Sequence, residues 1–368
     1  MSALAGMRVL DLTRLLPGGF CTLLLADFGA DVIKIEDTGA GDYARADDAS
    51  FAALNRGKRS VSMDLKASGG RDAFLALCSG AGVVVESFRP GVMDRLGVGW
   101  PVLRELNPRL VYCAITGYGQ DGPLAARAGH DLNYLARTGV LALSGDEDGP
   151  PVQSSAQIAD VAGGALMAAF GILAALRSGS GQFVDISMAD GALSMLAMPA
   201  AALLRGGPAP RRGSLVLGGR LLCYRPYECA DGWISVGALE PKFWAAFCRG
   251  VGREDLIEHQ FDAPGSWAHG EVCALARERT RAEWEAFNTE HDCCVEPVLE
   301  LDEALAGEQV RARVMVAGDL LGNPIRLSET PPDPLRGPPP GLGEHTRDVL
   351  AEAGLDADAL IASGAARG

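Results

Sequence analysis

The segment 7–36 holds a strand, a helix and a second strand, and this order constrains the fold more than any other feature of the chain. Residues 7–12 (MRVLDL) and 31–36 (DVIKIE) are short apolar runs, whereas 18–30 (GGFCTLLLADFGA) has the pattern of a small-residue-rich helix. Two strands joined through a helix run parallel, because a hairpin turn cannot connect parallel neighbours. The segment therefore predicts a parallel sheet.

The same alternation continues beyond this first unit. Further strands are expected at 59–65, 83–88 and 109–115, with a helix over 70–80. The fold class predicted is α/β, with a large Rossmann-like doubly wound domain and a smaller α+β domain. The first turn after a strand reads TRLLPGGF and lacks the GxGxxG pattern of dinucleotide-binding proteins.

Two stretches rich in Gly, Pro and Arg predict linkers. Between them lies a hairpin pattern with Asp-Gly at its turn, followed by mostly helical text. The domains expected are a large domain over 1–204, a linker over 205–221, a small domain over 222–325, a second linker over 326–344, and a C-terminal helix within 345–368 that returns to the large domain.

Composition excludes several classes of protein. The net charge is −14 and no basic stripe appears, so no nucleic-acid partner is expected. Nine cysteines include no CxxC pair, which indicates neither a zinc site nor a disulfide framework. No secretory signal is apparent and no run is expected to reach the ~18 apolar residues of a membrane span, so a cytoplasmic protein without membrane contact is predicted.

His130 is the only histidine before residue 259. It follows the loop TGYGQDGP (116–123), which comes after a predicted strand, and it precedes the short helical pattern LNYLA. Ligands of open α/β sheets bind beyond the carboxyl ends of strands, and imidazole titrates near neutral pH. These observations make His130 a candidate proton-transfer residue, although a histidine that packs or caps locally gives the same pattern.

Asp160 and Glu240 are the other candidates. Asp160 stands at the head of a long apolar helix over 159–179, where an aspartate also serves as an N-cap. Free backbone N–H groups at such a helix start can stabilise a developing oxyanion. Glu240 precedes a proline in VGALEP, and a first-turn acid of the next helix is the alternative interpretation.

With these residues in place, the chain resembles the family III CoA-transferase superfamily (CaiB/BaiF), and within it the 2-methylacyl-CoA racemases. The similar blocks cover nearly the whole chain. They are RVLDLTRLLPGGFCTLLLADFGADVIKIE (8–36), NRGKRSVSMDLK (55–66), ESFRPGVMDRLGVG (86–99), ITGYGQDGP (115–123), GHDLNY (129–134), IADVAGGAL (158–166), DGWISVGALEPKFW (231–244), CCVEPVLELDEA (293–304) and GEHTRDVLAEAGL (343–355).

The resemblance implies two alternative chemistries. In the racemases, His130 and Asp160 would be acid/base groups on opposite faces of the α-carbon, and Glu240 would orient His130. In the CoA-transferases, the aspartate matching Asp160 is a nucleophile that forms an acyl anhydride. The motifs Gly-His-Asp and VGALEP and the block at 293–304 are similar to the racemase versions. A homologue that only binds acyl-CoA is a third hypothesis, which these three residues argue against.

The resemblance also implies a CoA site without a metal or a separate cofactor, since CoA enters as part of the thioester. The residues expected to contact CoA are Leu15, Leu16, Met63, Phe88, Arg89, Arg95 and Tyr134. Many family members have an arginine where this chain has Asp37, and Arg45 is a candidate substitute.

An interlocked homodimer is implied too, with Glu240 reaching the site of the partner chain. Asp131, Asn133 and Tyr134 are expected to hold the imidazole of His130 in place. Three methionines could contact the acyl group, although methionines at helical spacing are typical of an ordinary core. They are Met188, Met195 and Met198.

Overall fold

The computed structural model describes residues 2–368 and divides the chain into two units. The first contains the residues up to Thr138 together with Ser154–Met195 and Glu308–Gly368, and the second contains Gly139–Gln153 and Leu196–Gly307. Residues 139–153 and 196–204, placed in the large domain on sequence grounds, thus belong to the second unit. Residues 308–325, assigned to the small domain, belong to the first.

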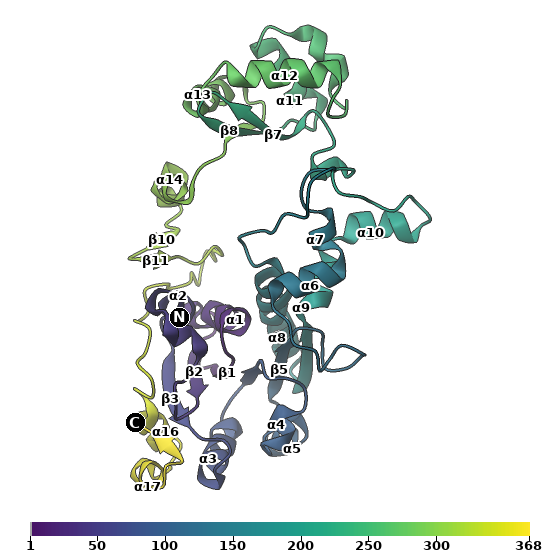
Figure 1. The fold of residues 1–368 in the computed structure, drawn as a ribbon. Coiled ribbons are helices and arrows are strands. Elements are labelled where there is room, and N and C mark those ends of the chain that lie inside the picture. Colours follow the sequence, from purple (N-terminus) through teal and green to yellow (C-terminus); the bar gives the residue numbers. More distant parts are fainter. Residues whose placement is uncertain (1) are drawn as a thin grey trace. The chain divides into compact units, whose positions relative to one another are not determined.

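A seven-stranded sheet forms the centre of the first unit, in the order β12-β3-β2-β1-β4-β5-β6 (Figure 1). All neighbouring strands are parallel except β12, which pairs antiparallel with β3. The strands are β1 (Arg8–Leu12), β2 (Asp31–Glu36), β3 (Arg59–Met63), β4 (Val83–Glu86), β5 (Val111–Thr116), β6 (Gln182–Ser187) and β12 (Ala366–Arg367). The α/β class with a parallel sheet is therefore confirmed.

The helices of the first unit follow the strands in the alternation that the sequence indicates. They are α1 (Leu16–Asp27), η1 (Tyr43–Ala46), α2 (Asp48–Asn55), α3 (Ser68–Ser79), α4 (Val92–Arg95), α5 (Trp100–Leu106), α6 (Asp131–Thr138), η2 (Ala159–Leu166), α8 (Met167–Ser178), α9 (Met188–Ser194), α15 (Glu308–Ala312), α16 (Thr346–Glu352) and α17 (Ala357–Ala362). A two-stranded antiparallel ribbon comprises β10 (Val316–Ala317) and β11 (Leu320–Leu321). The apolar runs of β1 to β5 are buried on both faces, as expected for a sheet covered by helices, whereas the edge strand β6 is partly exposed.

The C-terminal segment differs from the single helix expected over 345–362. It forms two short helices, α16 and α17, and then the edge strand β12 on β3. Gly354, between the two helices, has φ +72°, a conformation that ends a helix and that glycine adopts without steric cost.

One helical stretch, Ala159–Ser178, is long and apolar enough by length and composition to cross a membrane. The expectation that no segment would reach that size is wrong here. In the first unit this stretch contacts α1, β5, β6 and α9, whereas Phe170 and Leu173 on it remain exposed. Its small residues account for the close packing, and its apolar side chains account for the high hydropathy.

The second unit is built on an antiparallel sheet of β7 (Tyr224–Cys229), β8 (Gly232–Gly237) and β9 (Val295–Pro297) (Figure 1). Its helices are α7 (Val140–Leu143), α10 (Ala197–Leu204), η3 (Val216–Gly218), α11 (Pro241–Gly250), η4 (Glu254–His259), α12 (Trp267–Arg277), α13 (Arg281–His291) and α14 (Leu301–Ala306). Trp244, Phe247 and Trp284 stack in a core of its own.

Candidate active site

A cavity of about 650 Å³ lies in the first unit at the carboxyl ends of its central strands. The turn after β1, the loop after β4 and the end of β5 supply part of its wall, and the segment 125–134 and the start of the long apolar helix supply another part. Tyr43 and Met188 also line it, whereas Met195 and Met198 do not. This size falls within the range of small-molecule sites in proteins, ~300–1,000 Å³. His130 and Asp160 both line it.

The backbone around His130 is fixed by residues of the helix that follows. The N–H of His130 donates to Oδ1 of Asn133 at 3.0 Å, and the hydroxyl of Tyr134 donates to the carbonyl of Gly129 at 2.6 Å. The first contact is half of a capping box, in which the N3 side chain reaches back to the residue before the helix. His130 therefore immediately precedes α6, and its exposed side chain lies beside the cavity.

Asp160 lies in the first turn of its helix rather than at the N-cap position, which Ile158 occupies. The first eight helical residues, 159–166, form a π-helix, a rare geometry that often occurs at functional sites. The backbone N–H of Asp160 donates to Oδ1 of Asp131 at 2.9 Å, and the N–H of Val161 donates to the carbonyl of Gln157. These two donors of the turn therefore already have partners.

The carboxyl group of Asp160 has a raised pKa. Burial raises its pKa to about 6, the negative charge of Asp131 adds to the rise, and His130 opposes it. Burial and the charge of Asp160 also raise the pKa of Tyr134 to about 12, so this phenol stays protonated. A carboxylate with a pKa near the working pH is well matched to a general base.

Glu240 belongs to the second unit, where it is the exposed N-cap residue of α11. Its backbone carbonyl accepts the N–H groups of Phe243 and Trp244, whereas its side chain makes no capping hydrogen bond. The carboxylate therefore has no structural task at this helix start, and its functional role stays a prediction.

Of the residues expected to bind CoA, the structure brings Leu15, Phe88, Arg89 and Tyr134 to the cavity wall. Leu16, Met63, Arg45 and Arg95 are not among its lining residues. Met63 is buried in the core on β3, and Arg95 is exposed at the end of α4.

Arg45, the candidate substitute for the arginine that the family often carries at position 37, is paired outside the cavity wall. Its guanidinium donates to both carboxylate oxygens of Glu36 and to the carbonyl of Pro340. Arg14, which the sequence analysis missed, lines the cavity instead and donates to Oδ2 of Asp37 at 2.9 Å.

Two further residues were missed. Arg127 lines the cavity, so three guanidinium groups, those of Arg14, Arg89 and Arg127, could attract the phosphates of CoA. Thr116, at the end of β5, is buried, and its hydroxyl has no hydrogen-bond partner within residues 2–368. The position of Arg127, three residues before His130, could have indicated it from the sequence. No local feature of the sequence distinguished Thr116.

No cluster of three or more metal-ligating side chains occurs in the described part of the chain, residues 2–368. The chemistry available in the cavity is therefore that of an imidazole, a carboxyl with a raised pKa, a buried hydroxyl and guanidinium groups.

Residues 4–346 match the family model "CoA-transferase family III". The chain belongs to CoA-transferase family III. It is 37% identical over 370 residues to the alpha-methylacyl-CoA racemase of Mus musculus, covering 97% of this chain and 95% of that protein. It is 34% identical over 400 residues to the succinyl-CoA:mesaconate CoA-transferase of Haloarcula marismortui, covering 97% and 98%.

A solved structure of a CaiB/BaiF family protein from Brucella suis has the same fold, with a TM-score of 0.84, 30% identity, and coverage of 96% of this chain and 99% of that chain. The family III chain is therefore an enzyme that acts on acyl-CoA, either as a racemase or as a CoA-transferase.

Proposed function

We propose that this family III enzyme is a 2-methylacyl-CoA racemase. The observation that carries the proposal is that His130 and Asp160 line one cavity. Inversion of a carbon next to a thioester needs one group that removes the α-proton and a second that returns a proton to the opposite face. A transferase that uses Asp160 as its nucleophile needs no imidazole beside it.

The reaction would run through an enolate. One of the two groups takes the α-proton, the electron pair moves onto the thioester oxygen, and the other group delivers a proton to the opposite face of the same carbon. Thr116 is the donor on the cavity wall that could share the negative charge, because its hydroxyl has no hydrogen-bond partner among the described residues, whereas the hydroxyl of Tyr134 already donates to the carbonyl of Gly129. The guanidinium groups of Arg14, Arg89 and Arg127 would hold the CoA phosphates.

We further propose a homodimer in which Glu240 of the partner subunit completes the site and orients His130. This arrangement follows from the resemblance to the racemases. It gives a function to the carboxylate of Glu240, which makes no capping hydrogen bond in its own chain.

The experiment is proton exchange on pure enantiomers of a 2-methylacyl-CoA in D₂O, followed by NMR and chiral analysis. The wild-type enzyme should incorporate deuterium at the α-carbon and racemise either enantiomer. His130→Ala should lower racemisation by about 10²–10⁴-fold while keeping exchange with one enantiomer only, because Asp160 still serves one face. His259→Ala is the control, since His259 does not line the cavity.

CoA transfer is the competing activity of the same family. Transfer from a donor thioester to a free acid, with an intermediate that hydroxylamine traps and that His130→Ala spares, would establish the transferase instead. Absence of α-exchange over short, long and ring-containing acyl chains would refute the racemase.

A further inference from the structure

Leu15 has a backbone conformation that a leucine does not adopt unaided. Its φ is +61° and its ψ is −148°, in a region that only glycine occupies without strain. It immediately precedes α1, makes no side-chain capping bond, and lines the acyl-CoA cavity together with Arg14 and Pro17. Something in the surrounding structure must therefore hold this turn in place.

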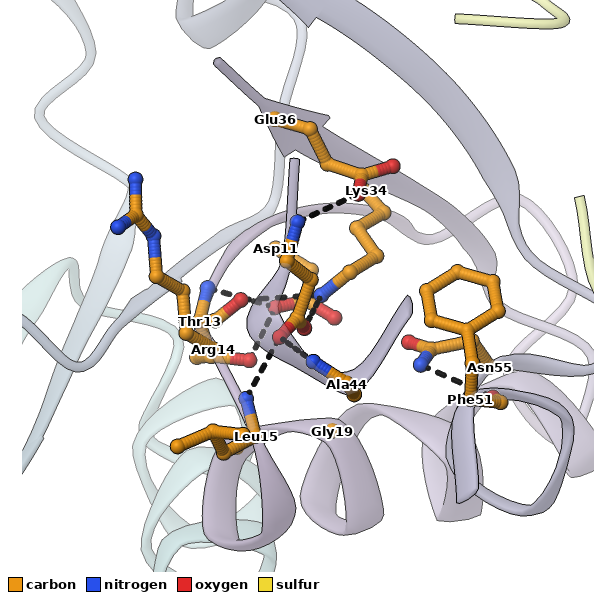
Figure 2. A network of polar contacts seen from close by, with 12 residues as sticks. Asp11, Thr13, Arg14, Leu15, Gly19, Lys34, Glu36, Ala44, Phe51 and Asn55 are labelled. Atoms are coloured by element: carbon orange, nitrogen blue, oxygen red, sulfur yellow. Dashed lines mark hydrogen bonds and ion pairs between the residues drawn. The ribbon is translucent and has the colours of Figure 1, made fainter. Parts of the chain in front are cut away.

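Three contacts hold the turn, each to a different backbone group. Figure 2 shows the turn residues Thr13, Arg14 and Leu15 together with Lys34. The N–H of Leu15 donates to Oδ1 of Asp42 at 3.0 Å, the N–H of Arg14 donates to the hydroxyl of Ser87 at 3.1 Å, and the carbonyl of Thr13 accepts Nζ of Lys34 at 2.9 Å. The first of these acts directly on the strained residue.

Asp42 is itself fixed by a buried ion pair. Its Oδ2 lies 2.7 Å from Nζ of Lys34, and both side chains are almost fully buried. Burial alone lowers the pKa of Lys34, but the charges of Asp11 and Asp42 outweigh burial and the pKa lies above its ordinary value. The lysine is thus a permanent cation that links Asp42 to the carbonyl of Thr13, at the opposite end of the turn.

Of the three side chains that hold the turn, only Ser87 lines the cavity. Asp42 and Lys34 are absent from the cavity wall, whereas Arg14 and Leu15 form part of it. We propose that Asp42 is a positioning residue: it holds Leu15 in the strained conformation and so sets the shape of the wall that receives the CoA part of the substrate. The proposal rests on the proposed function, because it needs an acyl-CoA ligand in this cavity.

The first experiment compares Asp42→Ala with Asp47→Ala. Asp47 accepts the N–H of Ser50 at the start of α2 and so caps a helix without touching Leu15. Asp42→Ala should weaken calorimetric binding of free CoA and raise the KM of the thioester by about tenfold, with kcat nearly unchanged. Asp47→Ala should leave both values unchanged. Equal effects of the two variants, or a loss confined to kcat, would overturn the proposal.

The second experiment introduces Leu15→Gly into the wild-type protein and into the Asp42→Ala variant. Glycine adopts a positive φ without an anchor, so Asp42→Ala should weaken CoA binding less in the Leu15→Gly background than in the wild type. Additive effects of the two substitutions would count against a link between Asp42 and the strained backbone.

If Asp42→Ala does not fold, Leu15→Ala and Leu15→Gly decide the matter with Asp42 intact. Both remove the same apolar side chain, but only glycine relieves the strain. Leu15→Gly should melt at the higher temperature and bind CoA more tightly, the reverse of the usual order of these two residues. The usual order would refute the inference.

The outcome for the proposed function is separate. A wild-type protein that binds CoA but exchanges no α-proton refutes the racemase and leaves the Asp42 test readable through CoA affinity. A wild-type protein that does not bind CoA overturns both proposals.

Discussion

Asp131 acts on Asp160 in two ways, through a hydrogen bond and through its charge. Its Oδ1 accepts the backbone N–H of Asp160, and its negative charge adds to the rise that burial causes in the pKa of Asp160. The hydrogen bond positions the carboxyl, and the charge makes it a stronger base. An asparagine at position 131 keeps an oxygen acceptor and removes only the charge.

We predict that Asp131→Asn moves the acid limb of kcat/KM to lower pH. In the proposed mechanism Asp160 removes a proton only when it is ionised, so activity should fall as the pH drops through its pKa of about 6. Without the neighbouring charge the ionised form is more favourable, and the limb shifts downward. The pH profile of kcat/KM measures this shift. Asp190→Asn, an exposed first-turn acid on α9, is the control and should leave the limb in place.

Thr116 offers a test of ligand contact. Its buried hydroxyl has no hydrogen-bond partner in the described part of the chain, and a buried polar group left unsatisfied costs about 1–3 kcal/mol. Valine has nearly the same shape without the hydroxyl. Thr116→Val should therefore raise the melting temperature of the free enzyme and lower kcat/KM by about tenfold, because the bound thioester loses a donor. A variant with unchanged kinetics would show that the hydroxyl does not reach the substrate.

At the scale of elements, the helix that carries Asp160 is placed by a close crossing. A Cβ added to Gly163 would lie 2.7 Å from the carbonyl oxygen of Met188, and one added to Gly191 would lie 2.1 Å from the carbonyl oxygen of Gly163. Both contacts are with backbone, which cannot move aside as the end of a side chain can. η2 and α9 therefore touch directly at these glycines.

We predict that Gly191→Ala destabilises the fold by about 1–3 kcal/mol and lowers kcat, because the added methyl group pushes η2 and Asp160 out of position. Gly270→Ala is the matched control. Gly270 lies inside α12, and a Cβ there would meet nothing within 4 Å. Alanine there should raise the stability slightly, since it restricts the unfolded chain. Thermal melts and initial rates of both variants test the comparison.

The sequence could predict the features of the fold that depend on local patterns, but not those that depend on packing between distant elements. The secondary structure of the segment 7–36 could be predicted because local periodicity marks its strands and its helix. The elements β1, α1 and β2 lie within a few residues of the expected positions. The helix at 159–179 was readable for the same reason. The π-helical start of that helix could not be predicted. This part of the helix packs on α9, which lies more than 20 residues further along the chain.

The candidate site was predicted in part for the same reason. His130 and Asp160 stood out through residue type and neighbouring loops, and the structure places both on one cavity. Arg14 and Arg45 could not be distinguished from sequence, since their roles depend on ion pairs with Asp37 and Glu36 that only the folded chain shows. Local patterns show which residues could act, whereas the fold decides which side chains are already engaged.

At the scale of the whole molecule, the chain passes several times between its two units, near residues 138, 153, 195 and 307. Linker composition reveals some of these passages but not the short excursion at 139–153. Such a chain distributes the proposed machinery over both units, with His130 and Asp160 on the first and Glu240 on the second. In the proposed dimer, each site therefore contains the histidine of one chain and the glutamate of the other.

We predict that two inactive variants restore each other when they are combined in one dimer. His130→Ala and Glu240→Gln chains, co-expressed with different tags and purified through both, give heterodimers. If each site combines two chains, one site of the heterodimer lacks both groups, and the other has His130 of one chain with Glu240 of the partner subunit. Because one of two equivalent sites is then intact, about half of the wild-type racemase activity should return.

If instead each site is built from a single chain, every site of the heterodimer lacks either the histidine or the glutamate, and activity should stay at the level of the two variant homodimers measured alongside. Size-exclusion chromatography with light scattering gives the oligomeric state of the same samples. A monomeric wild-type enzyme with full activity would refute the shared site directly, because Glu240 of the partner subunit would then not be needed.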